Sequence, residues 1–213
     1  MKILLICDGS EATERGARFL HHFQFPDHSR IVLLAAGKVT RRSFELENHL
    51  SRVKLILQNH FALVDQLVLP GRFLDQIRME TMENEYDLVV LGEDQPSHAL
   101  GKISKPKNAA PLLAHRLNIP LLIVRGLPER LDRVLICTSG KPAADLTLQT
   151  SGILLTGLPA DVIVHLLHVA KGKTTKNFLC VTSCLRIWIA VFSIPTFVEN
   201  PTQPNSTTPS RRD

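Results

Sequence analysis

An apolar run, KILLIC at residues 2–7, leads directly through Asp8-Gly9-Ser10 into a stretch of helical periodicity. A weaker copy of this turn, RVLICTSG, recurs at residues 133–140. Such a turn places backbone N–H groups and a carboxylate at the carboxyl edge of a parallel sheet, where open α/β folds bind their ligands. The doubled turn therefore predicts an α/β architecture of the nucleotide-binding kind, built as an imperfect tandem.

Strand-like and helix-like segments alternate through the first part of the chain. The apolar runs occupy residues 2–7, 30–36, 64–69, 86–91 and 119–125, and the helical patterns occupy residues 10–24, 40–60 and 72–85. Ser10 stands where a side chain would cap the first helix. Continuous apolar strands that alternate with helices are typical of a parallel sheet covered on both faces. Residues 1–127 are therefore predicted to form an open five-stranded parallel sheet with helices on both faces.

The remaining chain divides into two parts. Residues 128–170 read as an incomplete second copy, with a strand at 133–137, a helix at 141–155 and a strand at 161–169. Residues 171–213 break the alternation, and their last part is rich in Pro, Ser, Thr and Asn, which predicts disorder. The apolar stretch 178–198 is long enough to cross a bilayer, but Arg186 near its middle would cost about 3 kcal/mol to insert.

The charge distribution does not favour a nucleic-acid-binding protein. The net charge is +5, but residues 171–213 hold six Lys or Arg and two Asp or Glu, so 19 basic and 18 acidic residues remain before them. A nucleic-acid footprint is expected as a basic face on a folded domain. A nearly neutral body with a basic tail predicts no nucleic-acid partner.

The start of the chain and its cysteines point to the cytoplasm. The apolar run after Met1-Lys2 is too short for the h-region of a secretory signal peptide. Cys7 and Cys137 lie at matching places in the two strand-to-helix turns, and we expect both to be buried thiols that pack as small hydrophobic groups.

No pattern of a metal site or of a nucleophile is present. His165 and His168 are three apart on an expected strand and so point to opposite faces. Cys180 and Cys184 have no second Cys or His pair at zinc-site spacing. No serine lies in a G-x-S-x-G elbow. We therefore expect no metal ion and favour a protein that is not an enzyme.

Three blocks of the sequence resemble the universal stress protein family. They are KILLICDGSEATERGARFL, LPGRFLDQIRMETMENEYDLVVLG and LAHRLNIPLLIVRG, in the order and spacing of that family. The resemblance covers residues 2–125, and residues 133–170 as the opening of a second copy. It implies a nucleotide alpha-hydrolase-like sheet of order 3-2-1-4-5, dimers or tandem pairs, and in one branch ATP or a related nucleotide at the carboxyl ends of the strands.

In that branch an Asp that closes the first strand lies against the nucleotide, and the matching residue is Asp8. A loop of the form G-x2-G-x9-G-[ST] follows the fourth strand, and its glycines let the backbone approach the phosphates. Here Gly92 keeps the first glycine, Gln95 replaces the second, and Lys107-Asn108 stand where Gly and Ser/Thr are expected. The site implied by the resemblance thus lacks two of its three glycines.

The lysines of this loop, Lys102, Lys105 and Lys107, attract phosphate by charge but lack the geometry of a backbone cradle. The second copy has Thr138-Ser139-Gly140 in place of the first turn, so its carboxylate is absent. ATP with Mg²⁺ is the candidate cofactor, and the candidate cofactor-binding residues are Asp8, Gly9, Ser10, Ala36, Gly92, Lys107 and Asn108.

Three functions stay open at this point. The first is a cytoplasmic, non-catalytic stress-response or regulatory protein of the universal stress protein type, which forms homodimers through an exposed edge of the fifth strand. The second is an ATP-binding switch with weak hydrolysis, carried by Asp8, Gly92 and Asn108. The third, less favoured, is a membrane-tethered variant that uses residues 178–198.

Overall fold

The computed structural model describes residues 1–37, 43–93, 109–138, 142–168 and 190–192. Its centre is a parallel sheet in the order β3-β2-β1-β4-β5, as the resemblance implied. The strands are β1 (Lys2–Cys7), β2 (Arg30–Gly37), β3 (Leu63–Pro70), β4 (Leu88–Gly92) and β5 (Leu121–Val124). All five lie within one or two residues of the ranges that the apolar runs predicted.

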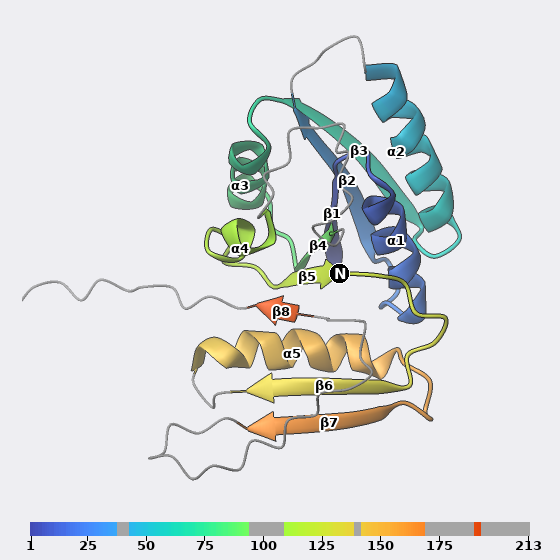
Figure 1. Ribbon diagram of the computed structural model, residues 1–213, viewed down its shortest axis with the longest axis vertical. Coiled ribbons are helices and arrows are strands. Elements are labelled where there is room, and N and C mark those ends of the chain that lie inside the picture. The colour runs from blue at the N-terminus through green and yellow to red at the C-terminus, as the bar shows by residue number, and fades with distance from the viewer. Residues whose placement is uncertain (38–42, 94–108, 139–141, 169–189, 193–213) are drawn as a thin grey trace, which may run out of the picture.

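Helices cover both faces of this sheet (Figure 1). On one face lie α1 (Glu11–Phe19), the short 3-10 turn η1 (Leu20–His22) and α2 (Ser43–Gln58). On the other lie α3 (Phe73–Glu83) and α4 (Ala109–Ala114). The alternation of strand side chains divides the core accordingly, since Leu5 and Cys7 face α1 and α2 while Leu4 and Ile6 face the other pair.

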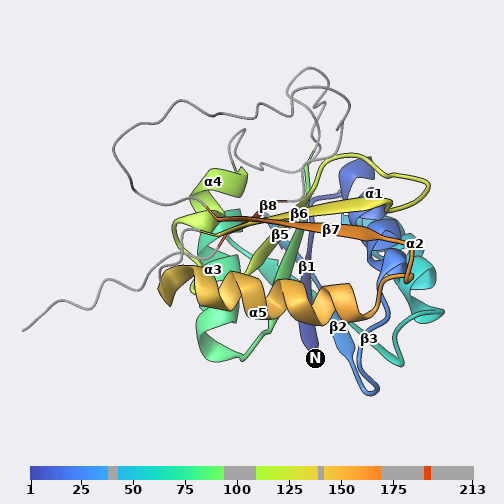
Figure 2. The ribbon, with the colours of Figure 1, turned by 90° about the horizontal axis from the view of Figure 1, so that it is seen from below.

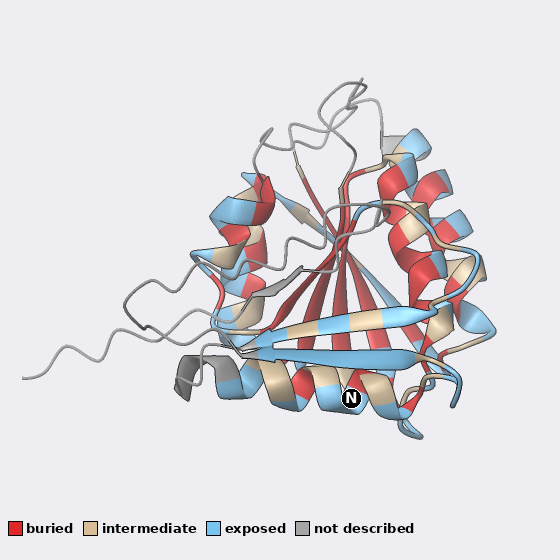
Figure 3. Ribbon diagram, turned by 60° about the horizontal axis from the view of Figure 1, so that its bottom comes forward, coloured by how far each residue is buried: buried red, intermediate tan, exposed pale blue. Residues whose placement is uncertain are grey.

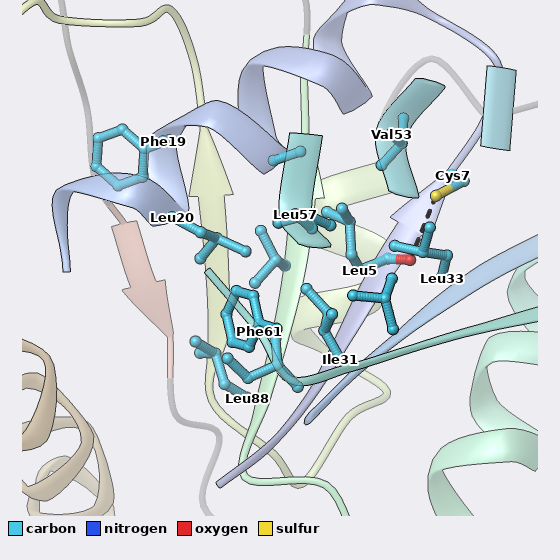
Figure 4. Close-up of a cluster of buried hydrophobic side chains, with 14 of the residues drawn as sticks. Leu5, Cys7, Phe19, Leu20, Ile31, Leu33, Val53, Leu57, Phe61 and Leu88 are labelled. Carbon is cyan, nitrogen blue, oxygen red and sulfur yellow. Dashed lines mark hydrogen bonds between the residues drawn. The ribbon is translucent and has the colours of Figure 1, made fainter. Parts of the chain in front are cut away.

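The core beneath α1 and α2 is built from long aliphatic and aromatic side chains (Figure 4). Leu5, Leu33 and Leu57 are fully buried there. Truncating one such side chain to alanine costs about 2–5 kcal/mol. This packing fixes the strand ends that carry the candidate site.

The second part of the chain forms the predicted β-α-β unit, with β6 (Arg133–Thr138), α5 (Pro142–Thr156) and β7 (Ile163–His168). This β-α-β unit packs against the first part of the chain near the end of α1. Leu154 of α5 joins the core beneath α1 and α2, and the Gln24 N–H donates to the Gly157 carbonyl oxygen at 3.2 Å. His22 Nε2 donates to the carbonyl oxygen of Pro128 at 3.1 Å.

The fifth strand does not lie at the sheet edge, contrary to the sequence-based expectation. A further strand, β8 (Ala190–Phe192), pairs antiparallel with β5 and makes the sheet six-stranded. The prediction failed because residues 190–192 lie in a tail that does not continue the alternation of strands and helices. The backbone groups of an open edge attract another strand, and the chain supplies one itself.

Cys137 is exposed, so the expectation of a buried thiol was wrong for this residue and correct for Cys7. In the register of β6 and β7, Cys137 lies beside Leu167 and shares its face with Leu135. Leu135 and Leu167 are 57% and 47% exposed, so the described residues do not bury them as α1 and α2 bury the side chains of β1 (Figure 3). Figure 2 shows that α5 lies along one face of the pair.

Among the helices of the described residues, none is both long and apolar enough to cross a membrane. Of the apolar stretch 178–198, the described part is β8 alone, and its remainder lies outside the described residues.

Candidate functional site

Asp8 is held in place at the carboxyl end of β1. The side chain is buried, and its Oδ1 accepts hydrogen bonds from the Ser10 N–H at 3.0 Å, the Ser10 hydroxyl at 2.5 Å and the Thr13 hydroxyl at 2.9 Å. Gly9 between them adopts a φ of 76°, a conformation that favours glycine. The turn predicted from Asp8-Gly9-Ser10 is thus a compact structure around one carboxylate oxygen.

Ser10 occupies the N-cap position of α1, as predicted, but its side chain does not cap the helix. Its backbone is extended, with φ −92° and ψ 161°, and its hydroxyl donates to Asp8 instead. The first helical turn is closed by the backbone, since the Thr13 N–H donates to the Ser10 carbonyl oxygen at 3.1 Å. The Ser10 hydroxyl therefore donates to the carboxylate, and its oxygen does not accept from a backbone N–H of the first helical turn as an N-cap side chain would.

Thr13 is the site residue that sequence reasoning missed. It is completely buried, and its hydroxyl donates to Asp8 Oδ1. The hydroxyl oxygen of Thr13 in turn accepts a hydrogen bond from the Asp8 N–H at 3.4 Å. A polar residue in the first helical turn, five positions after the strand-ending aspartate, was the available signal. Such a hydroxyl has no obvious role on a helix face that packs on a sheet.

Gly92 ends β4 against the backbone of α1. A Cβ at this position would lie 1.9 Å from the Ala12 carbonyl oxygen and 2.9 Å from the Thr13 backbone nitrogen. The absence of a side chain is therefore required by the close packing of α1 on β4, whether or not a ligand is bound. A Cβ on Gly16, one turn further along α1, would lie 3.6 Å from the Gly92 backbone nitrogen, which is an ordinary van der Waals contact.

Ala36 is buried at the end of β2. Because Cys7 pairs with Ala35 and Ile6 pairs with Leu91, the strand ends that carry Asp8, Ala36 and Gly92 lie together at one edge of the sheet. The order of strands reverses between β1 and β4, and ligands of open α/β sheets bind at such a point. Lys107 and Asn108, and with them Gln95, Lys102 and Lys105, lie outside the described residues.

Glu93, the residue after Gly92, is paired with Arg125. The guanidinium donates to Glu93 Oε2 from Nε at 2.8 Å, and the same oxygen accepts from Nη2. The Glu93 side chain is mostly buried and that of Arg125 is half exposed. The pair joins the carboxyl ends of β4 and β5, so the Glu93 charge is balanced within the protein.

A second polar cluster joins α1 to α2 behind this edge. The buried His49 places Nδ1 3.4 Å from Glu14 Oε1 and 3.3 Å from Arg52 Nη2, and Arg52 Nε donates to the same Glu14 oxygen at 3.2 Å. His49 Nε2 has no hydrogen-bond partner among the described residues. Burial lowers the pKa of His49, although the carboxylates of Glu14 and Asp8 act in the opposite direction.

Cys7 lies one residue before Asp8 and is not an activated thiol. Its Sγ donates to the Leu5 carbonyl oxygen at 3.6 Å (Figure 4). Burial raises the pKa of the thiol well above its usual value, and the Asp8 carboxylate raises it further. A buried, protonated thiol is a poor nucleophile.

Metal-ligating side chains do not converge in the part of the chain that the structure describes, where no group of three His, Cys, Asp or Glu residues is close enough to hold an ion. The edge offers a fixed carboxylate, the N-terminus of α1 and the closely packed end of β4. These features suit reversible binding of a polar ligand whose hydrogen-bond donors face the Asp8 carboxylate.

Neither a protein-family model nor a curated protein matches this sequence. Solved structures do match. A universal stress protein from Archaeoglobus fulgidus superposes with a TM-score of 0.52 at 15% identity, over 81% of this chain and 79% of that one. This likeness establishes that the chain has the fold of a universal stress protein.

Two further solved structures match this chain over nearly the whole of their own length. A universal stress protein in complex with cAMP matches with a TM-score of 0.47 at 15% identity, over 59% of this chain and 96% of that one. A universal stress protein family protein from Arabidopsis thaliana with AMP bound matches with a TM-score of 0.42 at 12% identity, over 62% of this chain and 95% of that one.

Proposed function

We propose that this chain is a non-catalytic regulatory protein of the universal stress protein type, which holds a nucleotide-class ligand at its carboxyl edge and acts through self-association. The observation that carries the proposal is the buried Asp8 carboxylate, fixed by Ser10 and Thr13 at the point where the strand order reverses. This is the place and the kind of group with which open α/β sheets bind nucleotides.

Asp8 matches the nucleoside part of such a ligand better than its phosphates. A carboxylate accepts hydrogen bonds from ribose hydroxyls or an exocyclic amine, whereas it repels a phosphate. Among the described residues of this edge, the positive end of α1 favours phosphate, although Glu11 and Glu14 in its first turn reduce that preference. We therefore expect a ligand that is bound mainly through its nucleoside.

The absence of turnover is supported by the state of the nucleophile candidates beside Asp8. The hydroxyls of Ser10 and Thr13 both donate to the carboxylate that shapes the turn, and the Cys7 thiol is buried and protonated. A hydrolase of this fold would need a group that activates water near the phosphates. An ATP-binding switch with weak hydrolysis is the second candidate, and the position of Asp8 at the reversal of strand order favours it.

Calorimetric titration of the full chain tests the binding. The ligands are AMP, cAMP and Mg-ATP, and the variants are Asp8→Asn and Asp27→Asn. Asparagine keeps an oxygen for Ser10 and Thr13 but removes the charge, so we expect affinity to fall about 5-fold, because a hydrogen bond to a charged group is worth roughly 1 kcal/mol more than a neutral one. Asp27 is exposed before β2, at the opposite edge, and its variant should bind as the wild type does.

A phosphate-release assay on the same samples separates the two candidates. The regulatory protein is expected to release no phosphate from Mg-ATP above the buffer rate. Release by the wild type that is lost in Asp8→Asn establishes the hydrolysing switch instead. If none of the three nucleotides binds at millimolar concentration, both candidates fail.

A further inference from the structure

The edge of β5 is filled by a strand from the end of the same chain. In β8, Phe192, Val191 and Ala190 pair with Leu121, Leu122 and Ile123. The β5 residues are buried, each at most 2% exposed. An uncovered strand of this kind would present an apolar edge with unpaired backbone groups.

Strand β8 runs antiparallel to β5, whereas every other neighbouring pair in this sheet is parallel. A two-fold axis between two copies of a chain brings identical edge strands together antiparallel. The backbone of β8 therefore follows the direction that β5 of a second copy would need in order to extend this sheet.

The β-α-β unit holds the chain close to this edge. Helix α5 lies against β8 and places Leu154 in the core of the first domain (Figure 1). The end of α5 touches the first domain so closely that a Cβ on Gly157 would lie 2.4 Å from both the nitrogen and the oxygen of the Gln24 backbone. The unit thus has a tight contact of its own, separate from β8.

We propose that β8 is an intramolecular cap of the β5 edge, and that this edge binds a second copy of the chain when β8 is released. The inference rests on the self-association in the proposed function and specifies the surface and its regulation. A tethered strand acts at an effective concentration on the order of millimolar. It therefore outcompetes a second copy at micromolar concentration, even though β8 has only three residues.

Light scattering of the full chain with a double substitution, Val191→Pro and Phe192→Pro, tests the cap. Successive residues of a strand direct their N–H groups to opposite edges, so the double variant removes whichever donor faces β5. At about 10 µM, a concentration far below the effective concentration of a tethered strand, we expect the wild type to be a monomer of 23.8 kDa and the variant to have twice that mass.

Gly157→Ala is a second way to release β8 from β5. Its methyl group collides with the Gln24 backbone and displaces the end of α5, the helix that lies against β8. We expect a smaller dimer fraction than in the double variant. Gly152→Ala is the matched control, since a Cβ at Gly152 meets nothing within 4 Å. This control should remain a monomer.

Hydrogen exchange of the Leu121–Val124 amides, measured on the same samples, completes the test. In the dimers these amides should be as protected as in the wild type, since a second β5 replaces β8. A wild-type dimer, or variants that stay monomeric while their fold is intact by circular dichroism, would overturn the cap. Nucleotide titration of the variants reports on the Asp8 edge separately, so the cap can fail while ligand binding stands.

Discussion

At Gly92 the backbone of the sheet lies so close to that of α1 that a Cβ there would be 1.9 Å from the Ala12 carbonyl oxygen. We predict that Gly92→Ala lowers the free energy of unfolding by about 3 kcal/mol, the upper range for forced overpacking. Urea denaturation measures this loss.

Gly16→Ala is the matched control for Gly92→Ala. A Cβ on Gly16 would make contacts of 3.6 Å, and alanine is favoured over glycine in a helix interior by about 1 kcal/mol. Gly16→Ala should therefore be neutral or stabilising. Equal losses in the two variants would show that the approach of α1 to β4 is not the reason for the glycine.

Thr13 fixes Asp8 through a hydroxyl with no contact to solvent. Thr13→Val keeps the shape and removes the donor to Asp8 Oδ1, so the loss should be about 1–3 kcal/mol. Thr81→Val removes a hydroxyl that bonds only to carbonyl oxygens of its own helix, those of Ile77 and Arg78, and should cost less. A Thr13→Val protein as stable as Thr81→Val would contradict a structural role of the Thr13 hydroxyl.

At this scale the sequence located the carboxylate but not its supports. Asp8 was predicted because it ends an apolar run before a helix, a pattern that a single stretch of sequence displays. Thr13 and the packing reason for Gly92 depend on contacts across the turn and between β4 and α1, which no local pattern displays. The roles of Lys107 and Asn108 remain predictions, since both lie outside the described residues.

The contact between α1 and α2 should respond to pH through His49. Burial lowers its pKa, so the unfolded chain binds the proton more readily than the folded one. The stability that depends on neutral His49 is complete above the unfolded pKa of 6.5 and decreases as the pH falls below it. His21, whose pKa is also lowered by burial, with His60 adding to the effect, contributes with the same sign.

We therefore predict that the urea midpoint of the wild type falls between pH 7.5 and 5.5, and that His49→Leu reduces this fall. Leucine carries no proton and removes the unpartnered Nε2. His165→Gln, on the exposed β7, is the control and should keep the wild-type pH dependence. The same pH dependence in wild type and His49→Leu would exclude His49 as its source.

The elements themselves were predictable where the alternation of apolar runs and helical patterns is regular. The five parallel strands and the β-α-β unit follow from it, because each strand is a continuous apolar run flanked by polar turns. Strand β8 was not predictable, since Ala190–Phe192 lies inside a longer apolar stretch without alternation. Its position beside β5 is decided by the open edge, which exists only after the sheet has formed.

In the whole molecule, the two proposed functions use different edges of the main sheet. The carboxyl edge around Asp8 carries the proposed ligand, and the β5 edge with β8 carries the proposed control of self-association.

The two strand-to-helix turns differ in their surroundings. Cys137 was expected to be buried by analogy with Cys7, but it is exposed on a sheet of two strands. The analogy of the two turns holds for the local strand and helix and fails for the layers around them.

Titration of the ¹⁵N-labelled full chain with AMP, followed by two-dimensional NMR, tests whether a nucleotide binds beside Asp8. We predict chemical-shift changes at the amides of Gly9, Ser10 and Gly92, at the carboxyl ends of β1 and β4, with none near Asp27 at the opposite edge. The absence of shifts at millimolar AMP, or shifts centred away from Asp8, would contradict the proposed ligand site.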